Sequence, residues 1–283
     1  MLELLPDRWS KKIPLKDFAN CREVFSGPIF LLASGASAAQ FPAKRYRDYP
    51  FVAMNGSIVR CVQEAIEPLF YICDDPNFVK GRPDLAVLGV KQGKNLALSL
   101  EVLKEIHAYD DAVLEGKQIY LLERANRQFG HRVKSDRLFA WSVRKDEEIC
   151  LKFSLLRQKT NRIGFSRNLS RGYFVARTIP YAGAQLAFHL GFRLVFIVGM
   201  DLNPSVGRFY ESDEAKVLPT SLDRHYEDYI VPSFKLMSRK VCREGGFQVF
   251  NLSKDSRLPA SVLPKIALSE LDEYISANLG VSV

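Results

Sequence analysis

The sequence predicts an α/β protein with a mostly parallel, Rossmann-like sheet. Three short apolar runs, at residues 28–34, 50–54 and 68–73, stop at the small or polar residues SG, NGS and DDP. A stretch with helical spacing, Ile58 to Ile66, separates the second run from the third. Buried strands that alternate with helices and end in such turns are typical of a parallel sheet covered on both faces.

The remaining elements follow along the chain from the period of the apolar residues. We expect further strands at 86–90, 118–122, 193–198 and 247–250. We expect helices at 99–107, 178–190, 221–243 and 268–277. The helix at 178–190 carries many small residues and therefore fits close packing on the sheet. The strand at 193–198 is the most apolar of these and ends at Gly199-Met200-Asp201.

The stretch 123–171 differs from the rest of the chain. It is rich in Arg, Lys, Asn and Gln and has weak periodicity. Long irregular segments inside folded proteins are usually functional or disordered. We therefore expect a single Rossmann-like domain over residues 1–283, with 123–171 as a lid or an acceptor-binding insertion.

The positive charge of the chain is concentrated in one window. The 283 residues carry a formal net charge of +8. Between Glu148 and Asp201 there is no acid, whereas the window holds Lys152, Arg157, Lys159, Arg162, Arg167, Arg171, Arg177 and Arg193. Such a segment suits nucleic acid, an anionic membrane surface, or a phosphorylated or carboxylated substrate. The alternative is a basic face that only contacts water.

Cysteine usage and hydropathy indicate a cytoplasmic protein, soluble or peripheral to the membrane. The five cysteines are scattered with no CxxC pattern, which argues against a zinc site and a disulfide framework. The N-terminal sequence lacks the charged-then-apolar order of a signal peptide. The longest strongly apolar run, 194–200, is too short to cross a bilayer. No recognisable nucleic-acid-binding motif is present, so we expect no nucleic-acid partner.

Ligands of open α/β sheets bind beyond the carboxyl ends of the strands. Four segments are expected there: Ser34-Gly35-Ala36-Ser37, Asn55-Gly56-Ser57, Asp74-Asp75 and Gly199-Met200-Asp201. Neither GxGxxG nor the P-loop pattern occurs. The SGAS segment either cradles a phosphate or is only a capped strand–helix turn. The Asp74-Asp75 pair either holds a divalent ion or caps the next turn, and no DxD tripeptide is present.

Three further residues are candidates for chemistry. His225 lies near the start of a predicted helix and can act as a general base near neutral pH, or it is only an exposed helix residue. Arg208 and Tyr210 follow a flexible glycine and can bind a leaving phosphate, or they belong to a surface loop anchored by an aromatic ring. His189, between two apolar residues on a helix, is expected to be a core or interface histidine.

An ordered set of short blocks carries a resemblance to a known family. The blocks are FLLASGAS, FVAMNGSI, PLFYICDD, ARTIPYAGAQLAFHLGFRLVFIVGMDL, GRFYES and FNLSKDSRLP. The set resembles the lipopolysaccharide core biosynthesis proteins of the RfaZ/WaaZ type, which transfer a third 3-deoxy-D-manno-octulosonic acid (Kdo) to the inner core. It is more distantly similar to the Campylobacter-type CMP-sialic acid transferases. The similarity covers roughly residues 28–80 and 160–275.

The resemblance implies a variant GT-A fold and a set of site residues. Ser34, Gly35 and Ser37 would hold CMP, and Asn55 with the adjacent Gly56 would bind the nucleotide or its phosphate. Arg177 and Thr178 would hold the donor carboxylate, and Gly199 and Asp201 would lie near the cytidine ribose. Two phosphate-contacting tyrosines of the family correspond to Asn203 and to Phe209 or Tyr210. The catalytic histidine of the family falls near His225.

The resemblance also implies the reaction. The protein would be an inverting, metal-independent glycosyltransferase that transfers Kdo from CMP-Kdo to the Kdo/lipid A inner core. It would need no cofactor, and its partners would be a CMP-activated sugar donor and an anionic glycolipid acceptor at the cytoplasmic face of the inner membrane. Another CMP-nonulosonate transferase of the sialyl type, or a non-catalytic basic binding module, are the alternatives.

Overall fold

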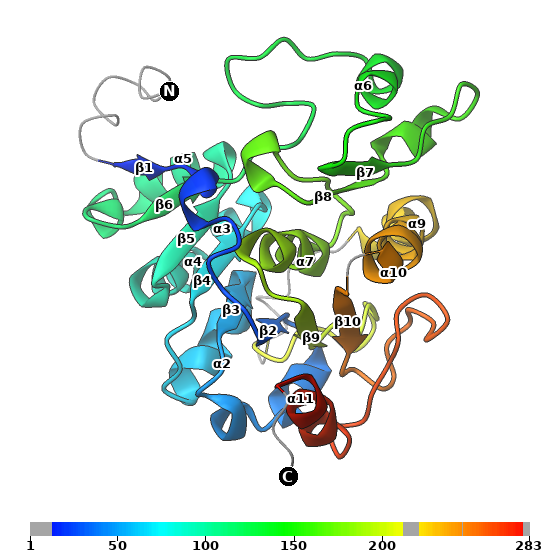
Figure 1. Cartoon of the computed structure of the whole chain (residues 1–283). Coiled ribbons are helices and arrows are strands. Elements are labelled where there is room, and N and C mark those ends of the chain that lie inside the picture. The colour runs from blue at the N-terminus through cyan, green and yellow to red at the C-terminus, as the bar shows by residue number, and fades with distance from the viewer. Residues whose placement is uncertain (1–12, 212–220, 245, 280–283) are drawn as a thin grey trace.

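The structure, a computed structural model, describes residues 13–211, 221–244 and 246–279. An eight-stranded sheet runs through the molecule (Figure 1), and all neighbouring strands in it are parallel. Its order is β1 (Leu15–Lys16), β6 (Ile119–Leu121), β5 (Asn95–Leu98), β4 (Phe70–Cys73), β3 (Phe51–Met54), β2 (Pro28–Leu32), β9 (Leu194–Val198) and β10 (Gln248–Asn251). The predicted parallel α/β fold is therefore confirmed.

The path of the chain through the sheet reverses beside β2. From β2 the chain moves outward through β3, β4, β5 and β6, and it later returns to β9 and β10 on the other side of β2. Phe30 of β2 is paired with Phe51 of β3 and Phe196 of β9, and its ring stacks on both at 5.1 and 5.4 Å. The carboxyl ends of β2 and β9 thus flank a topological switch point, where ligands of such sheets bind.

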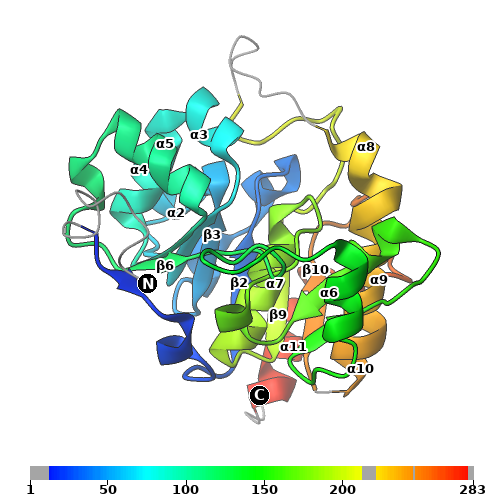
Figure 2. The ribbon, with the colours of Figure 1, turned by 90° about the horizontal axis from the view of Figure 1, so that it is seen from above.

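Helices cover both faces of the sheet (Figures 1 and 2). One face carries α2 (Ile58–Gln63), α3 (Pro76–Gly81), α4 (Pro83–Gln92), α5 (Leu100–Tyr109) and α11 (Leu271–Leu279). The other face carries α7 (Ile179–Leu190) and the helix that begins after residue 221. Two separate hydrophobic clusters result, one on each face. Because strand residues alternate between faces, each buried strand supplies both clusters.

The expected strand at 86–90 is wrong, because these residues lie inside α4. Pro83 occupies the first turn, where its missing N–H costs nothing, and Asp84 adds a favourable charge there. The buried residues Leu85, Ala86, Gly89 and Val90 follow a spacing of three to four. A short apolar run does not distinguish a strand from a buried helix. The strand β5 begins after this helix, at Asn95.

The predicted helix over 221–243 is confirmed as a continuous helical run with two π-helical segments. It comprises α8 (Leu222–His225), a π-helix (Tyr226–Ile230), α9 (Val231–Leu236), a second π-helix (Met237–Val241) and α10 (Cys242–Glu244). π-helical turns are rare and occur frequently at functional sites. The first of them begins directly after His225.

The stretch 123–171 forms an ordered layer over α7. It contains α6 (Asp136–Ser142) and a two-stranded antiparallel sheet of β7 (Ile149–Leu151) and β8 (Gly164–Ser166). Its buried side chains, such as Phe139 and Phe165, belong to the same hydrophobic cluster as α7. The prediction that this stretch acts as a lid stays a prediction.

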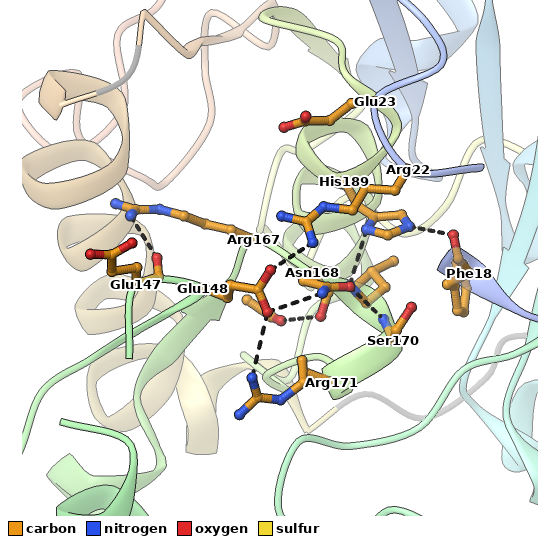
Figure 3. A network of polar contacts seen from close by, with 12 residues as sticks. Phe18, Arg22, Glu23, Glu147, Glu148, Arg167, Asn168, Ser170, Arg171 and His189 are labelled. Carbon is orange, nitrogen blue, oxygen red and sulfur yellow. Dashed lines mark hydrogen bonds and ion pairs between the residues drawn. The ribbon is translucent and has the colours of Figure 1, made fainter. Parts of the chain in front are cut away.

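A polar network ties this layer to the N-terminal part of the chain (Figure 3). Glu148 forms an ion pair with Arg22 at 2.6 Å and a longer one with Arg171 at 3.5 Å, and the Asn168 amide donates to it at 3.1 Å. Burial opposes the charge of Glu148, but these partners outweigh it and lower the pKa of the carboxyl. The network therefore favours one fixed position of the β7–β8 layer.

His189 of α7 lies next to this polar network and is fully buried, as predicted for a core histidine. Its Nδ1 accepts the backbone N–H of Leu169 at 3.2 Å, so its Nε2 carries the proton and donates to the Phe18 carbonyl at 2.9 Å. Burial is the main reason why its pKa lies below the usual value. No helix in the described part of the chain is both long enough and apolar enough to span a bilayer.

Candidate active site

The turns after β2 and β9 lock together at the switch point. The Gly35 N–H donates to the Gly199 carbonyl at 2.8 Å. A side chain on Gly35 would place a Cβ atom 2.5 Å from both that carbonyl and an Asp201 carboxylate oxygen, so only glycine fits. Gly199 itself has a φ of +73°, a left-handed conformation that glycine adopts without strain.

Asp201 holds the SGAS turn from across the sheet. Its carboxylate accepts the Ser37 backbone N–H at 2.9 Å and also the Ser37 hydroxyl. The same hydroxyl lies 2.9 Å from that of Ser253, after β10. The Gly35 and Ser37 N–H groups are thus already used inside the protein. A phosphate could therefore not bind these two N–H groups, and it would contact the half-buried outer side of the turn at Ser34–Ala36.

The loop after β9 crosses back over the ends of β2 and β3. The Phe209 N–H donates to the Ser34 carbonyl at 3.1 Å, and Arg208 pairs with Gly35 as an isolated antiparallel bridge. The Tyr210 ring lies directly on Gly56, where an added Cβ atom would come within 2.3 Å of it. This loop therefore brings Ser34, Gly35, Gly56, Arg208 and Tyr210 close together, and their role in a common site stays a prediction.

Tyr210 is half-buried and packed against its neighbours. Burial raises the pKa of its phenol to about 12, which keeps it protonated and a hydrogen-bond donor at neutral pH. The Arg82 guanidinium lies 5.6 Å from its ring centroid. The cation–π contact and the packing on Gly56 fix the ring, so Tyr210 contributes to the wall of the site.

Arg208 and Asn203 are occupied by contacts within their own loop. Arg208 forms an ion pair with the buried Glu211 carboxylate at 2.5 Å, and its backbone N–H donates to the same carboxylate at 3.1 Å. The Asn203 side-chain oxygen accepts both the backbone N–H and the hydroxyl of Ser205, at 3.1 and 2.7 Å. Neighbouring residues 212–220 lie outside the described parts of the chain.

Asn55 carries an unusual backbone and an unpaired polar atom at the end of β3. Its φ is +50°, a conformation that non-glycine residues adopt rarely and mostly as Asn or Asp. Its side-chain oxygen is buried and has no hydrogen-bond partner. A buried amide without a partner costs about 1–3 kcal/mol, and such a cost at a strand end indicates a ligand that supplies the missing bond. This is the most direct structural indication of a ligand at the predicted edge.

A second group of predicted residues lies at the start of α7 and of the helix after residue 221. Arg177 has a φ of +63° and directly precedes Thr178, the N-cap residue of α7. The Arg177 guanidinium lies 5.7 Å from the ring centroid of Tyr229, and the His225 ring packs edge-on against the same tyrosine at 5.7 Å. Burial and then the charge of Arg177 lower the pKa of His225. His225 is therefore neutral at pH 7 and able to accept a proton.

Asp74 has partners that the sequence did not indicate. Tyr173 donates a short hydrogen bond to its carboxylate, and the half-buried Arg124 lies 3.6 Å away. Burial raises the pKa of Asp74, although both partners oppose the shift. Asp75 caps α3 through the Asn77 N–H at 3.0 Å, which is the capping alternative. Among the described residues, no group of three or more His, Cys, Asp or Glu side chains could hold a metal ion.

The acid-free window is less basic in space than in sequence. Four of its bases form ion pairs with acids from outside the window. The pairs are Lys159–Asp228, Arg162–Asp136, Arg171–Asp146 and Arg193–Glu23. None of the ion pairs among the described residues involves Arg177. Half of the eight bases are therefore neutralised by acids from outside the window, and among the others Arg177 is the one that lies near the candidate site.

A cavity of about 400 Å³ lies elsewhere on the same edge of the sheet. Residues around the ends of β1 and β6 line it, including Lys16, Phe18, Glu123 and His131. None of the predicted site residues lines it. The sequence analysis did not anticipate this cavity, because its walls come from the weakly periodic stretch after residue 123.

The fold places the chain among Rossmann-like α/β proteins, a class whose ligands usually bind at the switch point of the sheet. A family model for "3-deoxy-D-manno-octulosonic acid transferase WaaZ" matches residues 17–269. The chain therefore belongs to this family, and it is a glycosyltransferase of the Kdo transferase class. The matched range contains every predicted site residue.

Two curated relatives and one solved structure are similar to the chain. A "Probable 3-deoxy-manno-octulosonic acid transferase" of Salmonella typhimurium is 26% identical over 87% of this chain and 88% of its own length. A protein of the same name from Escherichia coli K12 is 26% identical over 94% and 92%. The MAf glycosyltransferase of Magnetospirillum magneticum AMB-1 matches with a TM-score of 0.46 and 15% identity, over 94% of this chain and 38% of that one.

Proposed function

We propose that the protein transfers Kdo from CMP-Kdo to the Kdo/lipid A inner core of lipopolysaccharide, with inversion and without a metal ion. The family match over residues 17–269 carries this proposal. The names of the two curated relatives support the transferred sugar. The CMP donor, the inversion and the absence of a metal rest on the sequence resemblance, and the experiments below test the donor and the metal.

The donor nucleotide binds at the carboxyl ends of β2, β3 and β9 in this proposal. The bonded turns at Gly35 and Asp201 shape the floor, and Tyr210 forms one wall. The unpaired amide oxygen of Asn55 accepts a hydrogen bond from an N–H or O–H group of the nucleotide. Ser34 presents its half-buried backbone beside this position.

His225 and Arg177 serve the reacting centre in this proposal. His225 takes the proton from the attacking acceptor hydroxyl, because its lowered pKa keeps it neutral at pH 7. The acceptor oxygen bonds to the anomeric carbon of Kdo, the bond to the CMP phosphate oxygen breaks, and CMP leaves with that electron pair. Arg177 and the adjacent Thr178 bind the donor carboxylate, for which the unpaired guanidinium of Arg177 is better suited than the ion-paired Arg208.

The acceptor is an anionic glycolipid, so the reaction takes place beside a membrane. In this proposal the protein works at the cytoplasmic face of the inner membrane as a peripheral protein, without a nucleic-acid partner. Arg124, which Asp74 and Tyr173 hold on the same edge of the sheet, is exposed enough to meet an acidic group of the acceptor.

Release of CMP tests the proposal directly. Purified protein is incubated with CMP-Kdo and Kdo-lipid A in the presence of EDTA, and free CMP and the extended glycolipid are measured. We expect CMP release that depends on the acceptor and persists with EDTA. CMP-sialic acid in place of CMP-Kdo tests the donor sugar. Folded protein that releases no CMP with the acceptor would overturn the proposal.

A further inference from the structure

One corner of the β7–β8 layer exposes several large apolar side chains close together, which is unusual on the surface of a soluble protein. Leu138 and Trp141 of α6 are 62% and 53% exposed, and Leu155 and Leu156 of the loop after β7 are 67% and 93% exposed. We call these four residues the apolar face. Single exposed apolar residues are ordinary, but a group of large ones marks an interaction site.

The two elements that carry the apolar face lie side by side. Leu155 and Leu156 lie on the loop that follows β7, here called the leucine loop. Helix α6 packs against the 3-10 helix Gln158–Arg162, which directly follows this loop. The Arg162 guanidinium bonds Asp136 at the start of α6 at 2.6 Å. Figures 1 and 2 show α6 and the β7–β8 connection at the same corner of the molecule.

The leucine loop is held in a fixed shape from below. Asn161 is buried, and its side-chain amide exchanges two hydrogen bonds with the Ser154 backbone, each of 2.8 Å. The Ser154 hydroxyl accepts the Arg157 N–H at 3.0 Å. The closed loop places Leu155 and Leu156 at its tip. The hydrogen-bonded loop therefore holds both leucines in exposed positions.

Basic side chains lie around the apolar face, whereas the acidic side chains near it are paired with other arginines. Exposed Arg137, Arg144, Lys152 and Arg157 form a basic rim, and none of the ion pairs among the described residues involves them. The nearby acids Asp136, Asp146 and Glu148 are paired with Arg162, Arg171 and Arg22. Arg144 stacks on the Trp141 ring at 4.0 Å.

This combination fits the surface of an anionic bilayer. Protruding aliphatic side chains enter the boundary between headgroups and acyl chains, and tryptophan prefers that boundary. Lys and Arg at the same level are attracted to anionic headgroups. Leucine side chains offer no stacking platform to nucleic-acid bases, which need aromatic or guanidinium planes.

We propose that the apolar face and its basic rim dock the protein on an anionic lipid bilayer. The inference rests on the proposed function in one respect, because it assigns the surface that brings the glycosyltransferase to its lipid acceptor. The docking surface continues to the candidate site: Arg162 Nη1 lies 3.4 Å from the Tyr229 hydroxyl, and the Tyr229 ring contacts both His225 and Arg177. Docking thus turns the His225 side of the site toward the acceptor.

Sedimentation with vesicles tests the docking without any substrate. The full chain is mixed with vesicles of phosphatidylethanolamine and phosphatidylglycerol, or of phosphatidylcholine alone. We expect binding to the anionic vesicles that weakens as salt rises. The double substitution Leu155→Ser and Leu156→Ser should weaken it at least about tenfold, because each buried leucine contributes that order of affinity. Tyr109→Ser, at an equally exposed ring on α5, should leave it unchanged.

Fluorescence locates the contact. The chain has two tryptophans, so Trp9→Phe leaves Trp141 as the single reporter. Its emission should shift to the blue with anionic vesicles and be quenched by lipids brominated on the acyl chains. Absence of vesicle binding, or equal binding by the double-serine variant, would overturn the proposal. The proposal would also be overturned if the wild type forms a dimer, the double substitution abolishes that dimer, and the Trp141 emission does not change when lipid is added.

A soluble acceptor separates this proposal from the proposed function. Deacylated Kdo-lipid A needs no membrane, so the double-serine variant should release CMP with it at the wild-type rate. Loss of vesicle binding with retained transfer supports the docking surface. If transfer to the soluble acceptor fails in the wild type while vesicle binding persists, the proposed reaction is wrong and the docking surface stands. A double-serine variant that loses transfer to the soluble acceptor would place the leucine loop in the catalytic machinery and overturn the docking role.

Discussion

The carboxyl edge of the sheet and the β7–β8 layer are built by different means. At the edge, small residues and backbone groups from distant segments bond each other, as Gly35 does with Gly199 and Ser37 with Asp201. In the layer, charged side chains hold the segments together, as Glu148 does with Arg22 and Arg171. The first arrangement leaves no room for a Cβ atom at Gly35. The second leaves apolar side chains on the outside, which suits a surface that meets a partner.

The largest expected effect belongs to the edge, at His225. His225→Gln should lower kcat by about 10²–10⁴, the usual contribution of a general base, and leave the melting temperature unchanged because the side chain is only half-buried. In the wild type, kcat should rise with pH as His225 loses its proton, and this rise should be centred below pH 6.5 because the pKa of His225 is lowered. Acceptor-dependent CMP release across pH measures both.

The rise should be missing from the His225→Gln profile. Substitution of Arg224, the neighbouring exposed base, with Gln serves as the matched control and should keep the wild-type shape. A His225→Gln enzyme with the full rate and the same profile would show that another group accepts the proton.

The next effect concerns the close contact between the turn after β2, at Gly35, and the turn after β9, at Gly199 and Asp201. Gly35→Ala forces a Cβ atom against the Gly199 carbonyl and the Asp201 carboxylate, both at 2.5 Å. We expect a loss of about 1–3 kcal/mol in the free energy of unfolding, typical of overpacking, together with loss of nucleotide binding. Urea denaturation gives the first quantity. Ala39→Ser, at an exposed position shortly after in the chain, should cost little; if both substitutions behave alike, the locked turn is not what shapes the edge.

A smaller effect is expected in the layer. Glu148→Gln keeps the shape of the side chain but removes its ion pairs with Arg22 and Arg171. Because these charges are partly exposed, we expect a loss of about 0.5–1 kcal/mol that shrinks at high salt. Urea denaturation at low and high salt measures it. Glu67→Gln, at an exposed glutamate in the loop between α2 and β4, should change nothing. A salt-independent loss would mean that packing, not charge, holds the layer.

The pH dependence of stability tests His189, where the layer meets α7. Its pKa in the folded protein is below 6.5, so the unfolded chain binds the proton more readily. The stability contributed by neutral His189 is therefore present above pH 6.5 and declines as pH falls from 6.5 toward the folded pKa. Denaturation midpoints at several pH values should show this decline in the wild type. In His189→Gln this component should vanish; an unchanged decline would assign it to another group.

The sequence was sufficient where local pattern and tertiary structure agree. The apolar runs that became β2, β3, β4 and β9 were correctly predicted, because a strand buried on both faces needs a short apolar run that ends in a turn. Gly35 and Gly56 follow two of these neighbouring strands, and the loop after β9 adds Tyr210; their role in one site stays a prediction. The strand expected at 86–90 failed because a short apolar run fits a buried helix equally well.

The sequence was insufficient where a partner lies far along the chain. The eight bases of the acid-free window looked like a polyanion site, yet Asp136, Asp146 and Asp228 neutralise several of them from outside it. Spacing also could not show that Tyr173 and Arg124 meet at Asp74. These contacts depend on the packing of the insertion, which has no strong period of its own.

The central claim is a CMP site at the edge of the sheet, and thermal unfolding with nucleotides tests it most directly. CMP, UDP and ADP are compared with and without Mg²⁺, for the wild type and for Asn55→Ala. We predict that CMP alone raises the melting temperature, by about 5–10 °C at a concentration about a hundredfold above Kd, regardless of Mg²⁺. Asn55→Ala should lose most of this rise. Stabilisation by UDP with Mg²⁺, or by no nucleotide at all, would contradict the account.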